Sequence, residues 1–423
     1  MRSPKSRYLL LSVCALVMAA CGPRTESGAQ QAGKKTIRFI GKPTSGGGWK
    51  VLIEEFEAKN PDIDIEVVEG PSDTTAREDL YTTAFLSGKT PYDLIYMDVA
   101  WVAKFSATGW LRPLDDLFSL DRQKEFLPGD VMGSRFEGKT YRVPLHSDAG
   151  MLYYRKDLLA SVKETAPRTW DDLLRIAKKL QKPPQLLGYV FQGKQYEGLS
   201  CNFYEFVWGA GGSLQGPDGK LTVNSPAAVE ALGFLSSLPK EHAIAPVGVT
   251  TYQEEEARHL FQEGRAVFMR NWPYAWVLMQ KEGSPVKGKI GIIPMVHKQG
   301  AKSGATLGGW GFGIATAARY PQEAWRFVDF ITSAVSQKRL NQTEGFIPTR
   351  KALFKDPDML KANPYYPDLY EILLVAKPRP QSPKYTEISN ILQARISAVL
   401  VGQASPQAAL DEAQRKIEQV LAR

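Results

Sequence analysis

The sequence predicts an α/β fold, because short segments rich in β-branched residues alternate with segments of helical periodicity near the N-terminus. Strand character is found at residues 36–40, 63–69 and 93–97, and helical character lies between them, at residues 49–60 and about 74–87. Strands and helices that alternate in this order are typical of α/β proteins, in which the strands run parallel. We therefore expect parallel strands in this part of the chain.

Local patterns justify these first elements. In residues 49–60 (WKVLIEEFEAKN), Leu52 and Phe56 share one helical face, and the pair Asn60-Pro61 ends the helix. In residues 63–69 (IDIEVVE), apolar residues occupy every second position at first, which is the period of a strand.

Later helices have clear start signals. Thr169 and Asp172 form a capping-box pattern ahead of an apolar-periodic segment. Three further helices are expected to begin at Pro226, Pro321 and Pro406, because proline is favoured in the first turn of a helix.

The N-terminal segment has the pattern of a secretion signal. Three basic residues precede an apolar run at residues 8–20, which is too short to span a membrane. The run ends in Met18-Ala19-Ala20-Cys21, which resembles a bacterial lipobox. We expect a lipoprotein signal peptide at residues 1–20, a lipidated Cys21 and a flexible tether at residues 21–35. The alternative is an ordinary signal peptide with a cysteine placed by chance.

Charge and cysteine content limit the function further. The net charge is +8, and without residues 1–20 the chain keeps 50 basic and 45 acidic residues, a net of +5. Both signs are interspersed, so no nucleic-acid partner is expected. Only Cys201 remains in the body of the chain, which excludes an internal disulfide. The four histidines show no zinc-binding spacing, so we expect no metal and no cofactor.

Residues 133–140 (GSRFEGKT) match a phosphate-binding loop by composition alone. Such a loop requires a helix directly after it, and Pro144 follows four residues later. We instead expect a turn at Gly138-Lys139 between two short strands.

Eight stretches, taken in order, resemble the extracellular solute-binding lipoproteins of ABC importers, family 1, and in particular the trehalose/maltose-binding proteins. They lie at residues 97–116, 148–159, 191–201, 211–214, 270–276, 284–291, 305–310 and 377–380. The resemblance implies a two-lobed, hinged clamp of the type II periplasmic-binding-protein fold that binds a small carbohydrate in the cleft and docks on the transmembrane subunits of an ABC permease. It implies a monomeric binding protein rather than an enzyme, which faces the periplasm or cell exterior and touches the membrane only through its lipid anchor.

The same resemblance divides the chain between the lobes. The N-terminal lobe is expected to contain residues 36–145 with 305–348, and the C-terminal lobe residues 146–304 with 349–423.

The resemblance also implies a set of ligand contacts. They are Arg77, Asp98, His146, Asp148, Trp272, Gly309, Trp310 and Arg379. These residue types suit a sugar, since an indole face attracts the C–H face of a sugar ring, and carboxylate and guanidinium groups bind its hydroxyls. Two positions depart from the relatives: Gly47 replaces a carboxylate, and His146 replaces a tyrosine.

Alternatives remain for each part of this interpretation. The tryptophans could be core residues, Asp98 could be only a helix cap, and Arg77 and Arg379 could form surface ion pairs. Asp98 and Asp148 could instead be the carboxylate pair of a secreted glycoside hydrolase. A protein of the same fold could bind a non-sugar ligand such as a metal chelate or polyamine. The sugar itself stays open among trehalose, maltose, sucrose and glucosylglycerol.

Overall fold

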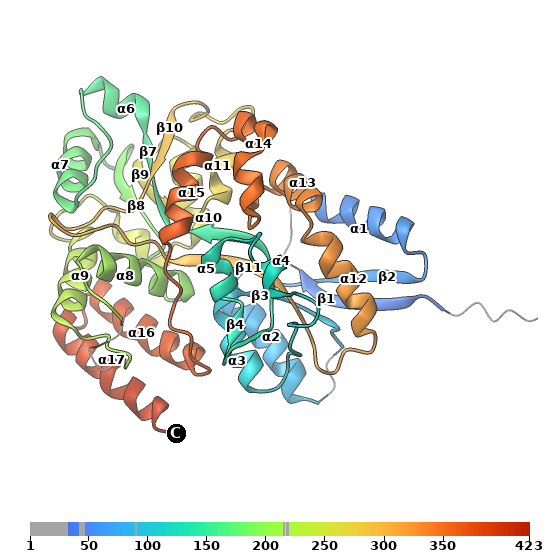
Figure 1. The fold of residues 1–423 in the computed structure, drawn as a ribbon. Coiled ribbons are helices and arrows are strands. Elements are labelled where there is room, and N and C mark those ends of the chain that lie inside the picture. The colour runs from blue at the N-terminus through green and yellow to red at the C-terminus, as the bar shows by residue number, and fades with distance from the viewer. Residues whose placement is uncertain (1–32, 42–46, 89–90, 215, 217–219) are drawn as a thin grey trace, which may run out of the picture.

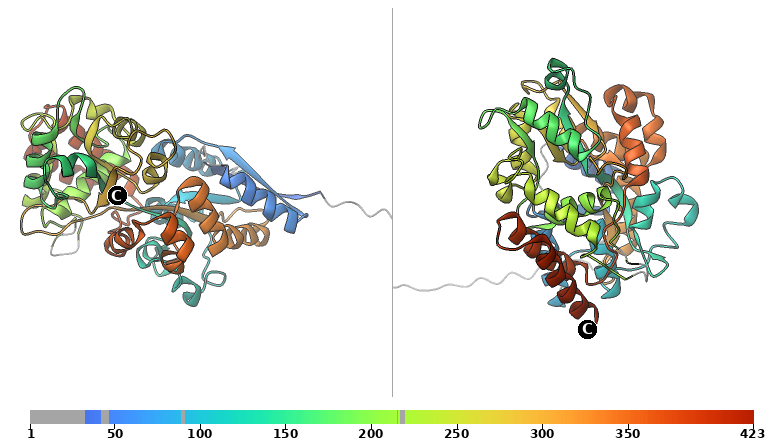
Figure 2. Two further views of the ribbon diagram at one scale, coloured as in Figure 1. Left: turned by 90° about the horizontal axis from the view of Figure 1, so that it is seen from above. Right: turned by 90° about the vertical axis from the view of Figure 1, so that its left-hand side faces the viewer.

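The computed structural model describes residues 33–41, 47–88, 91–214, 216 and 220–423. The expected signal peptide, Cys21 and most of the tether lie outside these residues. Two four-stranded sheets organise the described chain, with strand orders β12-β6-β11-β3 and β10-β7-β9-β8. We call the elements around the first sheet the N-terminal lobe and those around the second the C-terminal lobe; they lie at opposite ends of the molecule (Figures 1 and 2).

The N-terminal lobe contains the following strands: β1 (Lys35–Gly41), β2 (Ile63–Glu69), β3 (Leu94–Asp98), β4 (Arg135–Phe136), β5 (Lys139–Thr140), β6 (Val143–Ala149), β11 (Leu307–Ile314) and β12 (Ile347–Pro348). Its helices are α1 (Gly48–Lys59), α2 (Thr74–Leu86), η1 (Val99–Trp101), α3 (Val102–Ala107), α4 (Leu120–Gln123), α5 (Pro128–Met132), α12 (Pro321–Ile331) and α13 (Ala334–Glu344). The late helices α12 and α13 return to lie beside α1 (Figure 1).

The C-terminal lobe is built on β7 (Met151–Arg155), β8 (Leu187–Val190), β9 (Ala266–Asn271) and β10 (Ile290–Ile293). Its helices are α6 (Lys156–Ser161), α7 (Trp170–Leu180), α8 (Glu197–Gly209), α9 (Pro226–Ser237), η2 (Val247–Thr251), α10 (Glu254–Gln262), α11 (Tyr274–Met279), α16 (Tyr385–Leu400) and α17 (Pro406–Leu421). Between them in sequence come η3 (Lys351–Lys355), α14 (Pro357–Ala362) and α15 (Tyr366–Val375). The last two helices, α16 and α17, pack against α8 and α9 (Figure 1).

The local expectations from the sequence are largely confirmed. Thr169 and Asp172 form both hydrogen bonds of a capping box at the start of α7. Helices begin at Pro226, Pro321 and Pro406, as expected. The segment that matched a phosphate-binding loop is the antiparallel β4–β5 hairpin, as expected, but its turn is at Glu137-Gly138, one residue earlier than expected, because Lys139 already pairs in β5.

The expectation of parallel strands near the N-terminus is only partly correct. β1 and β2 pair in parallel, but β3 pairs antiparallel with β11, a strand more than 200 residues later. β6 also pairs antiparallel with β11, and among the described strands of the C-terminal lobe only β8 and β9 are parallel. The sequence pattern near the N-terminus contains no information about this distant central strand.

The chain first passes between the two sheets at Gly150, which separates β6 from β7. The expected boundary between residues 145 and 146 therefore falls within β6. A hydrophobic cluster joins the lobes around this crossover, since it includes Ala149 and Leu307 of the first sheet together with Tyr153 and Met269 of the second. No helix in the described part of the chain is both long and apolar enough to cross a bilayer.

Candidate ligand-binding site

Strand β11 places several of the expected ligand contacts on one face of the first sheet. Trp310 lies opposite Asp98 of β3 on one side and opposite His146 of β6 on the other. Two residues earlier, Gly308 lies opposite Asp148. Directly opposed residues in an antiparallel pair, and residues two apart in one strand, share a face. The pairing therefore brings Asp98, Asp148 and Trp310 together from three separate parts of the sequence.

Trp272 reaches this face from the C-terminal lobe. It follows β9, and its ring atom Cζ3 lies 3.2 Å from the point that a Cβ on Gly308 would occupy. The same point is 3.0 Å from the Cβ of Asp148. A side chain at position 308 would displace the ring, so the glycine permits an indole of one lobe to lie against the central strand of the other.

Each of the two indole rings carries a guanidinium group on one face. The Arg77 guanidinium lies 4.1 Å from the ring centroid of Trp310, and that of Arg270 lies 4.0 Å from the centroid of Trp272. Both tryptophans remain partly exposed. Such cation–π contacts are attractive and hold the ring planes in place.

The two arginines are themselves buried and are held by hydrogen bonds. Arg77 is buried and donates to the carbonyl oxygens of Pro71 and Ser72, at 3.1 and 3.2 Å. Arg270 forms a fully buried ion pair with Glu205 in α8. Arg77 is therefore a buried residue that lies over the Trp310 ring, and not a surface ion-pair residue.

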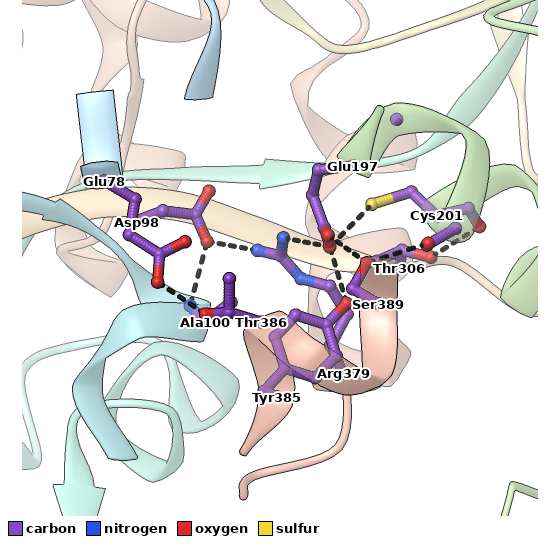
Figure 3. Close-up of polar contacts among 12 residues, drawn as sticks. Glu78, Asp98, Ala100, Glu197, Cys201, Thr306, Arg379, Tyr385, Thr386 and Ser389 are labelled. Carbon is purple, nitrogen blue, oxygen red and sulfur yellow. Dashed lines mark hydrogen bonds and ion pairs between the residues drawn. The ribbon is translucent and has the colours of Figure 1, made fainter. Parts of the chain in front are cut away.

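Arg379, in the segment before α16, joins Asp98 to a second carboxylate (Figure 3). Its guanidinium donates to Asp98 and, at 2.9 Å, to Glu197 at the start of α8. Burial by itself lowers the pKa of Arg379, but the Asp98 and Glu197 carboxylates outweigh it and hold that pKa well above its usual value. Asp98 also accepts from the backbone N–H of Ala100 at 2.8 Å. It is thus a helix cap and an ion-pair partner at once.

Glu197 joins the Asp98–Arg379 pair, and the sequence offered no assigned contact for it. Its carboxylate accepts from the hydroxyls of Tyr385 and Ser389 in α16, both at 2.5 Å, besides Arg379. A glutamate at the first position of a helix usually indicates only a favourable charge at the helix N-terminus. Its partners come from nearly 200 residues away, so local sequence gives no signal for this role.

His146 is enclosed and hydrogen-bonded. Its Nε2 lies 2.8 Å from the hydroxyl of Tyr96, and its Nδ1 lies 3.4 Å from Oδ2 of Asp148. The ring also stacks on Phe346 at 4.2 Å. In this arrangement the imidazole contacts Asp148 directly, and so it can orient that carboxylate.

Gly309 and Gly47 both adopt positive φ. Gly309 has φ +117°, and a Cβ there would lie 2.7 Å from the carbonyl oxygen of His146, so this position requires glycine. Gly47 has φ 70° and caps α1, with open space around it. Although position 47 lacks a carboxylate, Glu344 supplies one nearby, since it accepts from the N–H of Gly48 at 2.7 Å.

Helix α2 also contacts the C-terminal lobe. Glu78 of α2 accepts from Thr386 of α16 at 2.5 Å (Figure 3) and from Lys104 at 2.8 Å. A crevice beside these residues, lined also by Glu197 and Arg379, has a volume of only about 10 Å³. A larger surface cavity of about 820 Å³ is lined by α4, α5 and the β4–β5 hairpin, and none of the expected ligand contacts lines it.

Within the described residues, no three histidine, cysteine, aspartate or glutamate side chains are grouped so that they could hold a metal ion.

Comparison with known proteins decides the family. The model for bacterial extracellular solute-binding proteins matches residues 41–338. The chain belongs to this family. A probable ABC transporter-binding protein of Deinococcus radiodurans is 37% identical over 376 residues, which cover 86% of this chain and 89% of the relative.

Solved structures of solute-binding proteins agree with this assignment. Maltose-bound T. maritima MalE3 is 40% identical, with a TM-score of 0.85 over 91% of this chain and 99% of its own. A ribitol-bound solute-binding protein of Agrobacterium radiobacter K84 is 28% identical, with a TM-score of 0.82 over 91% of this chain and 98% of its own. A solute-binding protein of Thermotoga lettingae TMO bound to α-D-tagatose is 26% identical, with a TM-score of 0.83 over 92% and 100%. The two-lobed type II fold and the identification as an ABC-importer solute-binding protein are thereby confirmed. The chain is not an enzyme, which excludes a glycoside hydrolase built on Asp98 and Asp148.

Proposed function

We propose that this protein captures a disaccharide or small glucoside between its lobes and delivers it to the permease of an ABC sugar importer. The observation that carries the proposal is the approach of Trp272, from the C-terminal lobe, to β11 beside Trp310, Asp98 and Asp148. The ligand class is of the trehalose, maltose, sucrose or glucosylglycerol type. Binding of maltose by the relative that is 40% identical supports this choice.

The chemistry of the cluster suits a sugar ring. Each indole has one face held by a guanidinium, and the other can lie against the C–H face of a pyranose. Asp98 and Asp148, which lie opposite Trp310 and Gly308 in the sheet, provide carboxylate oxygens for the hydroxyls of a stacked sugar. A charge-assisted hydrogen bond in a buried site contributes about 1.5–3 kcal/mol. We assign His146 and Arg379 to this site as the groups that hold Asp148 and Asp98, and Gly309 as the residue that lets β11 bend beneath the ligand.

Sugar entry requires that the lobes move apart. The crevice beside Glu78, Glu197 and Arg379 is far smaller than a sugar, and a hydrogen bond between Glu78 and Thr386 joins α2 to α16. Hinge closure around a ligand is the usual motion of two-lobed binding proteins. The crossover at Gly150 lies in the segment that would bend.

We further propose that the mature protein is a monomer on the periplasmic or extracytoplasmic side, anchored to the membrane by a lipid on Cys21. The lobe boundaries belong to the same proposal, with the first crossover moved to Gly150. The sequence at residues 1–21 supports the anchor, and membership of an extracellular solute-binding family supports the location.

A sugar panel tests the ligand class. Isothermal titration calorimetry and tryptophan emission are measured for the mature protein with maltose, trehalose, sucrose and glucosylglycerol. Ribitol and α-D-tagatose represent the ligands of more distant relatives, and spermidine represents a non-sugar cation. We expect heat and a change in tryptophan emission with at least one glucoside. Binding of only a polyol, of tagatose or of spermidine would refute the disaccharide class.

A further inference from the structure

Glu254 is held against Trp272 by two hydrogen bonds. The residue opens α10, and its carbonyl oxygen accepts from Nδ2 of Asn271, the residue before Trp272, at 3.1 Å. Its carboxylate oxygen Oε1 accepts from the indole Nε1 of Trp272 at 3.2 Å. An indole has only this one donor, pointing along the ring edge. Glu254 therefore fixes the rotation of the ring, while Arg270 covers one of its faces.

Glu254 lies at the boundary between the lobes. The preceding residue, Gln253, donates from Nε2 to Oδ2 of Asp73 at 2.8 Å, across 180 positions of sequence. Asp73 caps α2, and the same helix carries Arg77, whose guanidinium covers Trp310. The start of α10 thus contacts both Trp272 and the helix α2 that carries Arg77, the residue covering Trp310.

The carboxylate of Glu254 retains unused acceptor capacity. It is partly exposed, and it lies beside Tyr196, whose pKa is held well above its usual value by burial and by the Glu254 charge. An ionised carboxylate offers about four lone-pair positions. Trp272 and Tyr196 together occupy at most two of them.

We propose that Glu254 is a specificity-determining residue of the sugar site, which orients the Trp272 ring through Nε1 and accepts a hydroxyl from the sugar that stacks on that ring. A pyranose stacked on an indole directs its equatorial hydroxyls outward at the ring edge, where this carboxylate lies. The inference rests on the proposed function, since it requires a sugar on Trp272. It adds a recognition group from α10, a helix from which the sequence predicted no contact.

The test compares Glu254→Gln with the wild type, using maltose and its monodeoxy analogues in calorimetry. Glutamine keeps an oxygen for Nε1 but removes the charge and half of the acceptor capacity. We expect about a tenfold loss of affinity for maltose and a much smaller loss for the one analogue that lacks the hydroxyl bound by Glu254. Glu263→Gln, at an exposed carboxylate just after the same helix, is the matched control and should bind as the wild type does.

The outcomes separate the inference from the function on which it rests. Unchanged binding of every compound by Glu254→Gln would overturn the inference while leaving the sugar site intact. If Glu254→Gln lost the same affinity for maltose and for every analogue, the proposed hydroxyl contact would be refuted. Glu254 would then act only by positioning the Trp272 ring. If the wild-type protein bound neither maltose nor any other glucoside of the sugar panel, the proposed function would fail as well. The near-ultraviolet circular dichroism of Glu254→Ala, compared in wild-type and Trp272→Phe backgrounds, then still tests ring positioning. If Glu254→Ala changed the spectrum by the same amount in both backgrounds, the positioning of the Trp272 ring by Glu254 would be refuted.

Discussion

Asp98 and Arg379 are 281 residues apart in the sequence, yet they form a buried ion pair whose side chains are 9% and 4% exposed. The carboxylate stands at the end of β3 in the N-terminal lobe, and the guanidinium also holds Glu197 of the C-terminal lobe. One arginine thus neutralises a carboxylate from each lobe. This arrangement predicts a large cost when the arginine is removed, because two carboxylates would then share a dry environment without a cation.

Replacement of Arg379 by methionine should lower the free energy of unfolding by about 3–5 kcal/mol, the usual cost of breaking a buried ion pair. Urea unfolding followed by circular dichroism measures this. The control is Arg326→Met, whose ion pair with Asp62 is half exposed on both sides and should contribute at most about 1 kcal/mol. Equal losses for both variants would show that the buried pair has no special role in stability.

The sequence located these two residues but could not assign their full roles. A cap was one expected role for Asp98, and a surface ion pair was one for Arg379. The cap is present, whereas the ion pair is buried rather than superficial. The cap is local, since it joins Asp98 to the N–H of Ala100 two residues later. The buried ion pair depends on α16 and the segment before it folding back on α2 and α8, and no local pattern encodes that approach.

Local elements could be predicted from the sequence because their signals lie within the elements themselves. Capping boxes, helix-opening prolines and strand periodicity act over a few residues, so the start of α7 and the β4–β5 hairpin followed from the sequence directly. The central position of β11 did not, because its antiparallel neighbours β3 and β6 come from residues 94–98 and 143–149. Glu197 and Glu254 were missed because each acts through a partner that only the fold supplies.

Gly309→Ala tests the backbone of β11 beneath the proposed site. Position 309 has φ +117°, and a methyl group there would lie 2.7 Å from the carbonyl oxygen of His146. We expect the free energy of unfolding to fall by about 2–4 kcal/mol, because the variant combines backbone strain with a steric shift of β11.

The matched control for this variant is Gly300→Ala. Gly300 also has a positive φ, +81°, but nothing lies within 4 Å of its Cβ position. For Gly300→Ala the free energy of unfolding should fall by only about 1–2 kcal/mol, the cost of the backbone conformation alone. Thermal unfolding of both variants measures the difference, and equal losses would refute the steric part of the argument.

Trp272→Ala tests the stacking surface. Removal of the indole should weaken binding of the best sugar in the panel by at least tenfold, or about 1.4 kcal/mol, because the C–H face of the sugar loses its aromatic contact. Trp272→Phe keeps an aromatic face and should lose less. Calorimetry measures both, and unfolding curves establish that each variant is folded. Wild-type affinity in the alanine variant would assign the ring to packing between the lobes alone.

Asp130 predicts a pH dependence of stability. This residue of α5 is fully buried beneath β11, and its Oδ1 lies 3.2 Å from the Cβ position of Gly309. Burial raises the pKa of Asp130 from 3.8 to about 7, although the buried Arg142 opposes the shift. Between these two values the unfolded chain has released this proton while the folded chain still holds it. The contribution of Asp130 therefore makes the protein less stable as pH rises through that range, by up to about 1.4 kcal/mol per pH unit.

Asp130→Asn removes this titration. The difference in unfolding free energy between the variant and the wild type should move in favour of the variant as pH rises from about 4 to 7, and it should level off above about pH 8. Urea unfolding at a series of pH values measures the difference, with Asp121→Asn, at an exposed carboxylate of α4, as the control. Curves for Asp130→Asn and wild type that stay parallel across this range would mean that Asp130 ionises as readily in the folded protein as in the unfolded chain. In that case the carboxylate beneath Gly309 would have to be compensated by Arg142 more strongly than its burial indicates.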